Sequence, residues 1–142
     1  MGYKLETALA DVIDNSIAAG ARNISVRFLW ANGDPWIAIL DDGHGMTGPE
    51  LIEAMRFGST SPLAVRSSED LGRFGLGMKT ASISQCRLLT VISRSGGTLS
   101  ACSWDLEHLA KQVSNDWEIL VHTNETLKAS PIIAPLLGPL TV

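Results

Sequence analysis

A glycine-rich stretch, residues 72–82, carries the first pattern in this sequence that could do chemistry. Three glycines alternate with bulky apolar residues, and Lys79 and Thr80 follow at once. Glycine adopts backbone conformations with positive φ and lets a ligand approach the main chain closely. Lys79 and the residues after it are typical of the first turns of a helix, where free N–H groups and the helix dipole attract anions. The stretch predicts a phosphate site, although a lone glycine motif is more often a flexible turn before a helix.

Two polar residues one helical turn apart, Asp11 and Asn15, form the second pattern. Apolar residues recur at helical spacing over residues 5–19, which predicts an amphipathic helix that ends at Gly20. Residues four apart on a helix project side by side, so Asp11 and Asn15 would share the polar face. Aspartate and asparagine compete for backbone hydrogen bonds and are unfavourable inside helices. The pair is therefore either a simple solvated face or part of a binding site.

The third pattern directly follows a strand. Residues 24–30 and 36–40 alternate like strands, and Asn32-Gly33 between them is a strong signal for a hairpin turn. The second strand runs into residues 41–46, Asp-Asp-Gly-His-Gly-Met. Two carboxylates followed by two glycines at a strand end predict a tight turn with a polar cup. On its own this turn could be no more than a loop.

The rest of the sequence alternates helices and strands. Thr47 and Glu50 form a helix-start signal, so a short helix is expected over residues 49–56. Polar residues with few large apolar ones predict a long loop over 58–76, and loops of this length inside a compact domain are usually functional. The other expected elements are a helix over 77–86, strands over 88–94 and 98–104, a helical or irregular segment over 105–113, and a strand over 117–122.

The composition is that of one soluble globular domain with a substantial core. The 142 residues are 45% hydrophobic and 18% charged, with a net charge of −4. The acidic balance argues against tight nonspecific nucleic-acid binding, and no apolar run approaches the roughly 20 residues that span a bilayer. Cys86 and Cys102 lie among apolar residues, which predicts buried thiols in a reducing cytoplasm. The chain ends without a stop signal, so a fragment of a longer protein is expected.

Together the three patterns resemble those of the GHKL ATPase superfamily, which includes the gyrase B subunit, the ninety-kilodalton heat-shock chaperone, sensor histidine kinases and MutL. Residues 10–21, Ala-Asp-Val-Ile-Asp-Asn-Ser-Ile-Ala-Ala-Gly-Ala, are similar at most positions to a helix pattern of MutL. The MutL and microrchidia branches look closest, and the resemblance covers roughly residues 5–120. Each motif alone is weak, whereas all three in this order and at these spacings are specific.

The resemblance implies an α+β class and the Bergerat fold, a two-layer sandwich of a mixed, mostly antiparallel sheet with helices on one face. The whole chain, residues 1–142, would be a single N-terminal ATP-binding domain with a lid loop over about 58–76. ATP and Mg²⁺ are the implied cofactors, and ATP or ADP the implied ligand. A nucleotide-dependent homodimer of a longer cytoplasmic protein is the implied assembly, without a membrane partner and without a direct nucleic-acid signal in this part.

The family's residue roles carry over position by position. Asn15 matches the asparagine that holds the magnesium ion, and Asp11 stands where hydrolytic members have their catalytic base. Asp41 matches the aspartate that accepts a hydrogen bond from the adenine amino group, and Gly45 matches the glycine that lets the base approach the backbone. The other residues that the resemblance assigns to the nucleotide site are Gly43, Met46, Gly72, Phe74, Gly75, Leu76, Gly77, Met78, Lys79 and Thr80.

The sequence departs from the family pattern at the base position. Hydrolytic members have glutamate there, and Asp11 is one methylene shorter. A misplacement on the order of 1 Å can lower a rate about a hundredfold, so the length of the Asp11 side chain bears directly on its reach to an attacking water. Ala18 also replaces an aspartate that follows the asparagine in MutL. The phosphate-sensing lysine that such ATPases usually draw from a following domain is not within the chain.

Three functions stay open on the sequence. The leading one is a Mg²⁺-dependent ATPase in which ATP binding closes the lid and dimerises a longer protein, and slow hydrolysis resets it. The second is a histidine-kinase-type phosphotransferase, although kinases of that type usually lack a base at the Asp11 position. The third is a nucleotide-binding module without turnover.

Overall fold

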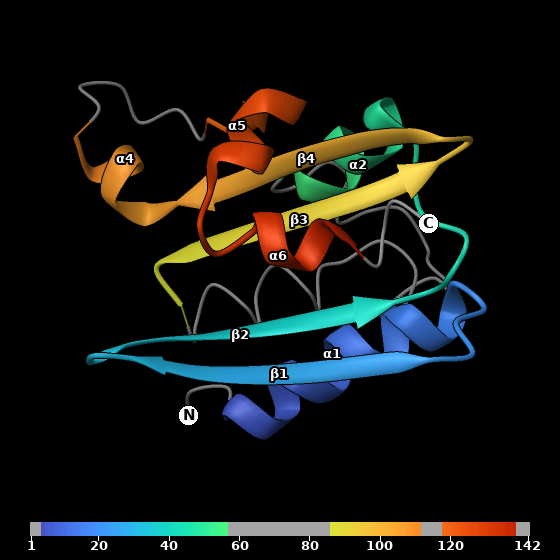
Figure 1. Cartoon of the computed structure of the whole chain (residues 1–142), viewed down its shortest axis with the longest axis horizontal. Coiled ribbons are helices and arrows are strands. Elements are labelled where there is room, and N and C mark those ends of the chain that lie inside the picture. Colours follow the sequence, from blue (N-terminus) through green and yellow to red (C-terminus); the bar gives the residue numbers. More distant parts are fainter. Residues whose placement is uncertain (1–3, 57–85, 112–117, 139–142) are drawn as a thin grey trace, which may run out of the picture. The chain divides into compact units, whose positions relative to one another are not determined.

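A computed structural model describes residues 4–56, 86–111 and 118–138 (Figure 1). These residues fall into two compact units. The first unit comprises residues 4–45, and the second comprises 46–56, 86–111 and 118–138. Both units contain antiparallel strands and at least one helix, so the predicted α+β class is confirmed.

The first unit is a helix followed by a β-hairpin. Helix α1 spans Leu5–Ala18, strand β1 spans Ile24–Ala31 and strand β2 spans Asp34–Asp41. The two strands pair antiparallel along their whole length. Asn32 and Gly33 have φ values of +48° and +91°, as a two-residue type I′ turn requires. The hairpin predicted from this Asn-Gly pair is therefore confirmed.

Helix α1 ends where its sequence predicts, at Gly20. The N–H of Gly20 donates to the carbonyl of Ile17 (2.9 Å), and the N–H of Ala21 donates to that of Ser16 (3.1 Å). These two bonds form a Schellman motif, which satisfies carbonyls left free at a helix C-terminus. Gly20 has a φ of +77°, a conformation that side-chain-bearing residues rarely adopt. The motif sets the direction in which the chain leaves α1 towards β1.

Asp42, the residue after β2, ties the end of the hairpin to its beginning. Its Oδ1 accepts hydrogen bonds from the backbone N–H groups of Asn23 (2.9 Å) and Arg22 (2.7 Å). Its Oδ2 accepts from the side-chain amide of Asn23 (2.8 Å). The bonds from the Asn23 main chain, the Asn23 side chain and the Arg22 main chain favour the ionised form and lower the pKa of Asp42 from 3.8 to about 2. Asp42 therefore has a structural role.

The second unit is built on a three-stranded antiparallel sheet. Its strands lie in the order β3 (Leu88–Ser95), β4 (Thr98–Asp105) and β5 (Leu120–His122). Its helices are α2 (Gly48–Met55), α4 (Leu106–Ala110), α5 (Asn124–Ala129) and α6 (Ala134–Leu137). The predicted start of α2 is confirmed as a capping box, because the Thr47 hydroxyl accepts from the Glu50 N–H and the Glu50 carboxylate accepts from the Thr47 N–H.

Strand β4 is the centre of the core of the second unit. Successive side chains of a strand point to opposite faces. On one face Trp104, which is 1% exposed, donates from Nε1 to the carbonyl of Met55 in α2 (2.7 Å). On the other face Ala101 belongs to a buried apolar cluster with Leu127 of α5 and Leu137 of α6. Strand β4 is therefore covered on both sides, by α2 and by the α5–α6 segment (Figure 1).

Two features of the second unit differ from expectation. The strand expected over 117–122 spans Leu120–His122 in the part that the structure describes, because it pairs only with residues 101–103 of β4. The prediction of a buried Cys86 is wrong: this residue is exposed, just before the chain enters β3. Cys102 is buried as predicted, and burial raises the pKa of its thiol.

Other predicted features fall outside the described residues. These are the lid loop over 58–76 and nearly all of the helix expected over 77–86. The segment expected to be helical or irregular over 105–113 contains α4. Across the described ranges, no helix is long and apolar enough to cross a membrane.

Replacing Asp42 by Asn should reduce the acid sensitivity of the fold. Its folded-state pKa of about 2 lies below the ordinary 3.8, so the charged form stabilises the folded state above about pH 4, and this contribution is lost as the pH falls towards 2. In that window the wild type should bind up to about one more proton on unfolding than Asp42→Asn does.

Urea unfolding followed from about pH 2 to pH 7 measures this difference in proton uptake. Asp34→Asn, an exposed carboxylate at the other end of the hairpin, is the matched control. The same pH dependence of unfolding free energy in the wild type and in Asp42→Asn would contradict the structural role of Asp42.

Candidate functional site

The end of β2 and the last turn of α1 meet in the first unit. The N–H of His44 donates to the carbonyl of Ala19, the residue that follows α1 (3.0 Å). A Cβ atom added at Gly43 would lie 2.8 Å from the Cβ of Ala19 and 3.0 Å from its carbonyl oxygen. The carbonyl is part of the backbone and cannot easily move aside, so glycine is the residue that fits at position 43. Gly43 therefore has a packing role, and its predicted contact with a nucleotide stays a prediction.

Gly45 is required by the backbone conformation of the same turn. Its φ of +71° lies in the left-handed region, which favours glycine. The ring Nδ1 of His44 donates to the carbonyl of Gly45 (2.8 Å), because a carbonyl oxygen can only accept. The predicted approach of a base to the backbone at Gly45 stays a prediction.

Asp41 presents an oriented carboxylate at this junction. Its Oδ1 accepts from the N–H of Gly43 (2.9 Å), and its Oδ2 accepts from the hydroxyl of Ser16 in α1 (2.8 Å). Ser16 is 4% exposed, whereas Asp41 is exposed at the end of β2. An ionised carboxylate has about four acceptor sites, so about two stay available. Asp41 can accept a further hydrogen bond without losing the two contacts that orient it.

The two adjacent aspartates differ in what they contact. The carboxylate of Asp42 is engaged by the start of β1, through Arg22 and Asn23. The carboxylate of Asp41 contacts α1 through Ser16 instead. Residue type alone does not distinguish the roles of these two aspartates. Their hydrogen bonds do: Asp42 bonds within the hairpin, and Asp41 bonds at the junction of α1 and β2.

Asp11 and Asn15 lie on α1, as their spacing predicts. Both residues are half-buried, whereas Asp14 between them in the sequence is exposed. Asn15 directly precedes Ser16, and about one and a half helical turns separate Asp11 from Ser16. A single short helix therefore carries the predicted metal ligand, the predicted base and the partner of Asp41.

A magnesium ion at Asn15 would need most of its ligands from elsewhere. Among the residues described, no three His, Cys, Asp or Glu side chains are grouped so that they could hold a metal ion. Magnesium typically binds through one or two protein oxygens together with phosphate oxygens and waters. The amide oxygen of a half-buried asparagine fits that kind of site, in which the nucleotide supplies part of the coordination.

The remaining predicted residues lie elsewhere. Met46 is half-buried and belongs to the second unit, where its N–H donates to the buried Ser93 hydroxyl of β3 (2.7 Å). Its predicted place beside the base stays a prediction. The residues predicted to surround the phosphates, from Gly72 to Thr80, lie outside the described part of the chain.

Sequence reasoning missed the contribution of Ser16 to this site. Helical periodicity over residues 5–19 places Ser16 on the apolar stripe of the predicted helix, among the packing residues. A hydroxyl in an otherwise apolar stripe is the signal that could have identified it, because a buried polar group needs a hydrogen-bond partner. That partner, Asp41, lies 25 residues further along the chain.

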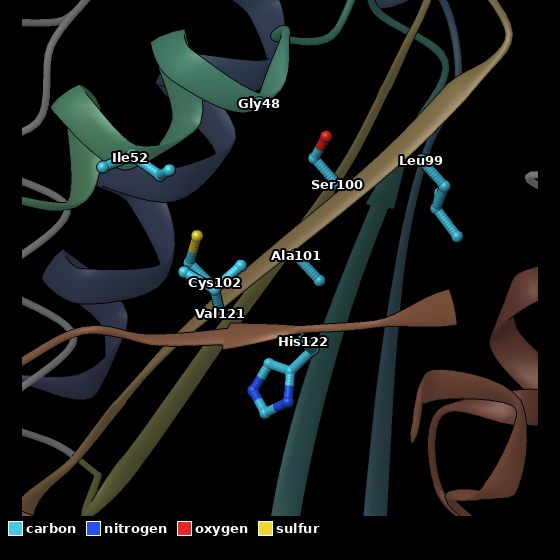
Figure 2. Close-up of a pocket in the computed structure, with 8 residues that line it drawn as sticks. All are labelled: Gly48, Ile52, Leu99, Ser100, Ala101, Cys102, Val121 and His122. Atoms are coloured by element: carbon cyan, nitrogen blue, oxygen red, sulfur yellow. The ribbon is translucent and has the colours of Figure 1, made fainter. Parts of the chain in front are cut away.

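A separate pocket of about 130 Å³ lies in the second unit, where α2 faces β4 and β5 (Figure 2). Its lining residues are Gly48, Ile52, Leu99, Ser100, Ala101, Cys102, Val121 and His122. Among the described residues, the lining carries no carboxylate or ammonium group, and Nε2 of His122 is engaged by the Ser103 hydroxyl (2.6 Å). Pockets for drug-sized ligands measure about 300–1,000 Å³. This pocket suits neither the size nor the charge of a nucleoside triphosphate.

Known proteins share most of this chain's sequence pattern. The sequence model of the family described as histidine kinase-, DNA gyrase B-, and HSP90-like ATPase matches residues 3–132. ATPase morc-1 of Caenorhabditis elegans is 30% identical over 95 residues, which are 67% of this chain and 11% of that protein. The DNA mismatch repair protein MutL of Paramagnetospirillum magneticum is 36% identical over 109 residues, which are 74% of this chain and 17% of that protein.

A third relative is the human structural maintenance of chromosomes flexible hinge domain-containing protein 1, which is 34% identical over 102 residues, or 54% of this chain and 5% of that protein. The chain thus spans less than a fifth of the length of each of these three relatives. MutL and morc-1 represent the two branches that the resemblance of the three motifs indicated, so that prediction is confirmed. The family match includes α1 and the whole hairpin. The chain belongs to the family of histidine kinase-, DNA gyrase B- and HSP90-like ATPases.

Proposed function

We propose that this chain binds ATP at the junction of α1 and β2, with the adenine amino group on the carboxylate of Asp41. The observation that carries the proposal is the orientation of that carboxylate. Ser16 and Gly43 hold one oxygen each, and the exposed side chain keeps acceptor capacity for one more donor. The packing of Gly43 against Ala19 keeps this turn close to α1. An amino group that donates a hydrogen bond is the ligand chemistry such an acceptor recognises.

The proposal places the phosphates and Mg²⁺ nearer to Asn15. Its amide oxygen would supply one protein ligand to the ion, and the phosphates and waters would supply the others. When bound, the ion would screen the negative charge of the phosphates. The half-burial of Asn15, compared with the exposure of Asp14, supports this face of α1 as the one turned towards a ligand.

Slow ATP hydrolysis is the proposed reaction. In this proposal Asp11 acts as the general base, which removes a proton from the water that attacks the γ-phosphate. A base in this role contributes about 10²–10⁴-fold to a rate. The name of one relative, ATPase morc-1, favours hydrolysis over phosphate transfer to a histidine. A histidine-kinase-type transferase and a module without turnover stay as the alternatives, and phosphate release against autophosphorylation separates them.

Closure and dimerisation complete the proposal for a longer polypeptide. The segment over 58–76 is proposed as the lid on the strength of the sequence alone. The relatives are several times longer than this chain, which fits a domain that works inside a larger protein. In such a protein ATP binding would join two copies, and hydrolysis would release them. We also propose that residues 1–142 form one ATP-binding domain of that protein.

The base specificity tests the role of Asp41. ATP should bind about 5- to 150-fold more tightly than GTP, because guanine presents a carbonyl where adenine presents an amino group, and an acceptor left unpaired beneath the bound base costs about 1–3 kcal/mol. Asp41→Asn should lower the ratio of the affinity for ATP to the affinity for GTP, since an amide can donate to the guanine carbonyl. Asp34→Asn, at the hairpin turn, should leave the ratio unchanged. Isothermal titration measures both affinities, and equal affinities of the wild type for ATP and GTP would contradict the assignment.

A second prediction concerns Asn15. The variant Asn15→Ala should lose the magnesium-dependent part of its affinity for a non-hydrolysable ATP analogue, so that its affinity is the same with Mg²⁺ and with EDTA. Its free energy of unfolding should change by less than about 1 kcal/mol, because the substitution removes a polar group from a helix face. Asp14→Ala, the exposed neighbour on the same helix, is the matched control and should keep the wild-type response. If Asn15→Ala keeps that response too, Asn15 does not hold the ion.

A third prediction concerns Asp11. The variant Asp11→Asn should lower phosphate release by about 10²–10⁴-fold while ATP still binds. Asp11→Glu should match or exceed the wild-type rate, because it restores the reach of the glutamate found in the family. Asp14→Asn should leave the rate unchanged. Phosphate release is measured in this chain and in any longer polypeptide that contains it. Turnover in Asp11→Asn within about twofold of the wild type would rule out a catalytic base at this position.

A further inference from the structure

We infer that Ser16 is a positioning residue for base recognition, because its hydroxyl holds the carboxylate of Asp41 in the orientation that meets the amino group of a purine. The inference rests on the proposed function of Asp41. It assigns to α1 a part in selecting the base, in addition to the metal and hydrolysis roles proposed for Asn15 and Asp11.

The hydroxyl of Ser16 has one proton and two acceptors within reach. Its Oγ lies 2.8 Å from Oδ2 of Asp41 and 3.4 Å from the carbonyl of Val12. A serine inside a helix commonly bonds to the carbonyl four residues earlier. Here the shorter distance and the negative charge of the carboxylate favour Asp41, since hydrogen bonds to charged acceptors are shorter and stronger. The proton of Ser16 is therefore directed to Asp41.

Burial makes this contact a fixed one. Ser16 is 4% exposed, so little water competes for its hydroxyl. Asp41, in contrast, is exposed, and the torsion that turns an aspartate carboxylate is broad and weakly restrained by itself. The bond from Ser16 to Oδ2 and the bond from the Gly43 N–H to Oδ1 together restrain that torsion. The acceptor sites that stay free therefore keep one direction.

The consequence for binding is specific to one ligand group. Without the Ser16 hydroxyl, the carboxylate keeps its bond to the Gly43 N–H but can turn and be hydrated. A donor on the base then has to reorder it, so the affinity that depends on that donor falls. The part of the affinity that comes from the ribose and the phosphates does not depend on the hydrogen bond between Ser16 and Asp41. Ser16 should thus affect nucleotides with a 6-amino group and spare those without one.

The experiment compares two nucleotides in two variants. ATP and purine riboside triphosphate, which lacks the 6-amino group, are titrated into the wild type, Ser16→Ala and Ser103→Ala. Ser103→Ala is the matched control, because Ser103 is a buried, hydrogen-bonded serine of the second unit. In Ser16→Ala the affinity for ATP should fall about two- to tenfold, and the affinity for purine riboside triphosphate should stay within about twofold, as expected for one lost hydrogen bond. Ser103→Ala should keep the wild-type ratio of the two affinities.

Two results in Ser16→Ala would overturn the inference. Equal weakening of the affinities for both nucleotides would give Ser16 a structural role only, and wild-type affinities for both would give it no role in recognition. A wild type that does not distinguish the two nucleotides would instead overturn the proposed function of Asp41, and the inference with it. If Ser16→Ala does not fold, Ser16→Cys takes its place, because cysteine has a similar volume and only a weak donor. In Ser16→Cys the ratio of the affinity for ATP to that for purine riboside triphosphate should fall in the same way. A wild-type ratio in Ser16→Cys would overturn the inference.

Discussion

The close contact between the last turn of α1 and the end of β2 is the constraint on which the candidate site depends. A side chain at residue 43 would meet the carbonyl of Ala19, so the contact requires Gly43. The same contact brings the Ser16 hydroxyl to Asp41 and the His44 N–H to the Ala19 carbonyl. The Schellman motif fixes the backbone at the end of α1, where this contact is made. Each of these bonds is local or joins two elements of one unit.

The consecutive aspartates at the end of β2 show how one strand end serves both folding and the site. Asp42 accepts three hydrogen bonds from the residues that lead into β1, which keep its carboxylate ionised to about pH 2. That anchor holds the hairpin ends together and leaves Asp41 at the side facing α1. Because Asp11, Asn15 and Ser16 all lie on α1, a movement of this helix would alter metal, water and base contacts together in the proposed site.

The sequence predicted well the features that depend on neighbouring residues. The end of α1 follows from Gly20, and the hairpin turn follows from Asn32 and Gly33, whose positive φ values the residue types favour. The length of β5 was not predictable in this way, because it depends on how many residues of β4 pair with it. The exposure of Cys86 likewise depends on where the chain enters the sheet.

The candidate site shows the same difference between features that depend on neighbouring residues and features that depend on distant contacts. Asp41 and Gly43 were found by their order at a strand end and by resemblance to a family to which the chain belongs. Ser16 was missed, because its hydrogen bond joins residues 25 apart and helical periodicity assigns it to the packing stripe. The roles of Asp11, Asn15, Asp41, Gly43 and Gly45 in nucleotide binding stay predictions, since they concern a ligand rather than contacts within the chain.

The central claim is that an adenine nucleotide binds at the junction of α1 and β2. Its most direct measurement is a titration of the ¹⁵N-labelled chain with a non-hydrolysable ATP analogue and Mg²⁺, followed by the amide chemical shifts. The account predicts saturable changes that, among the described residues, are largest at Ser16, Asp41, Gly43 and Gly45. Saturable changes confined to the pocket between α2, β4 and β5, or no saturable change at the junction, would contradict it.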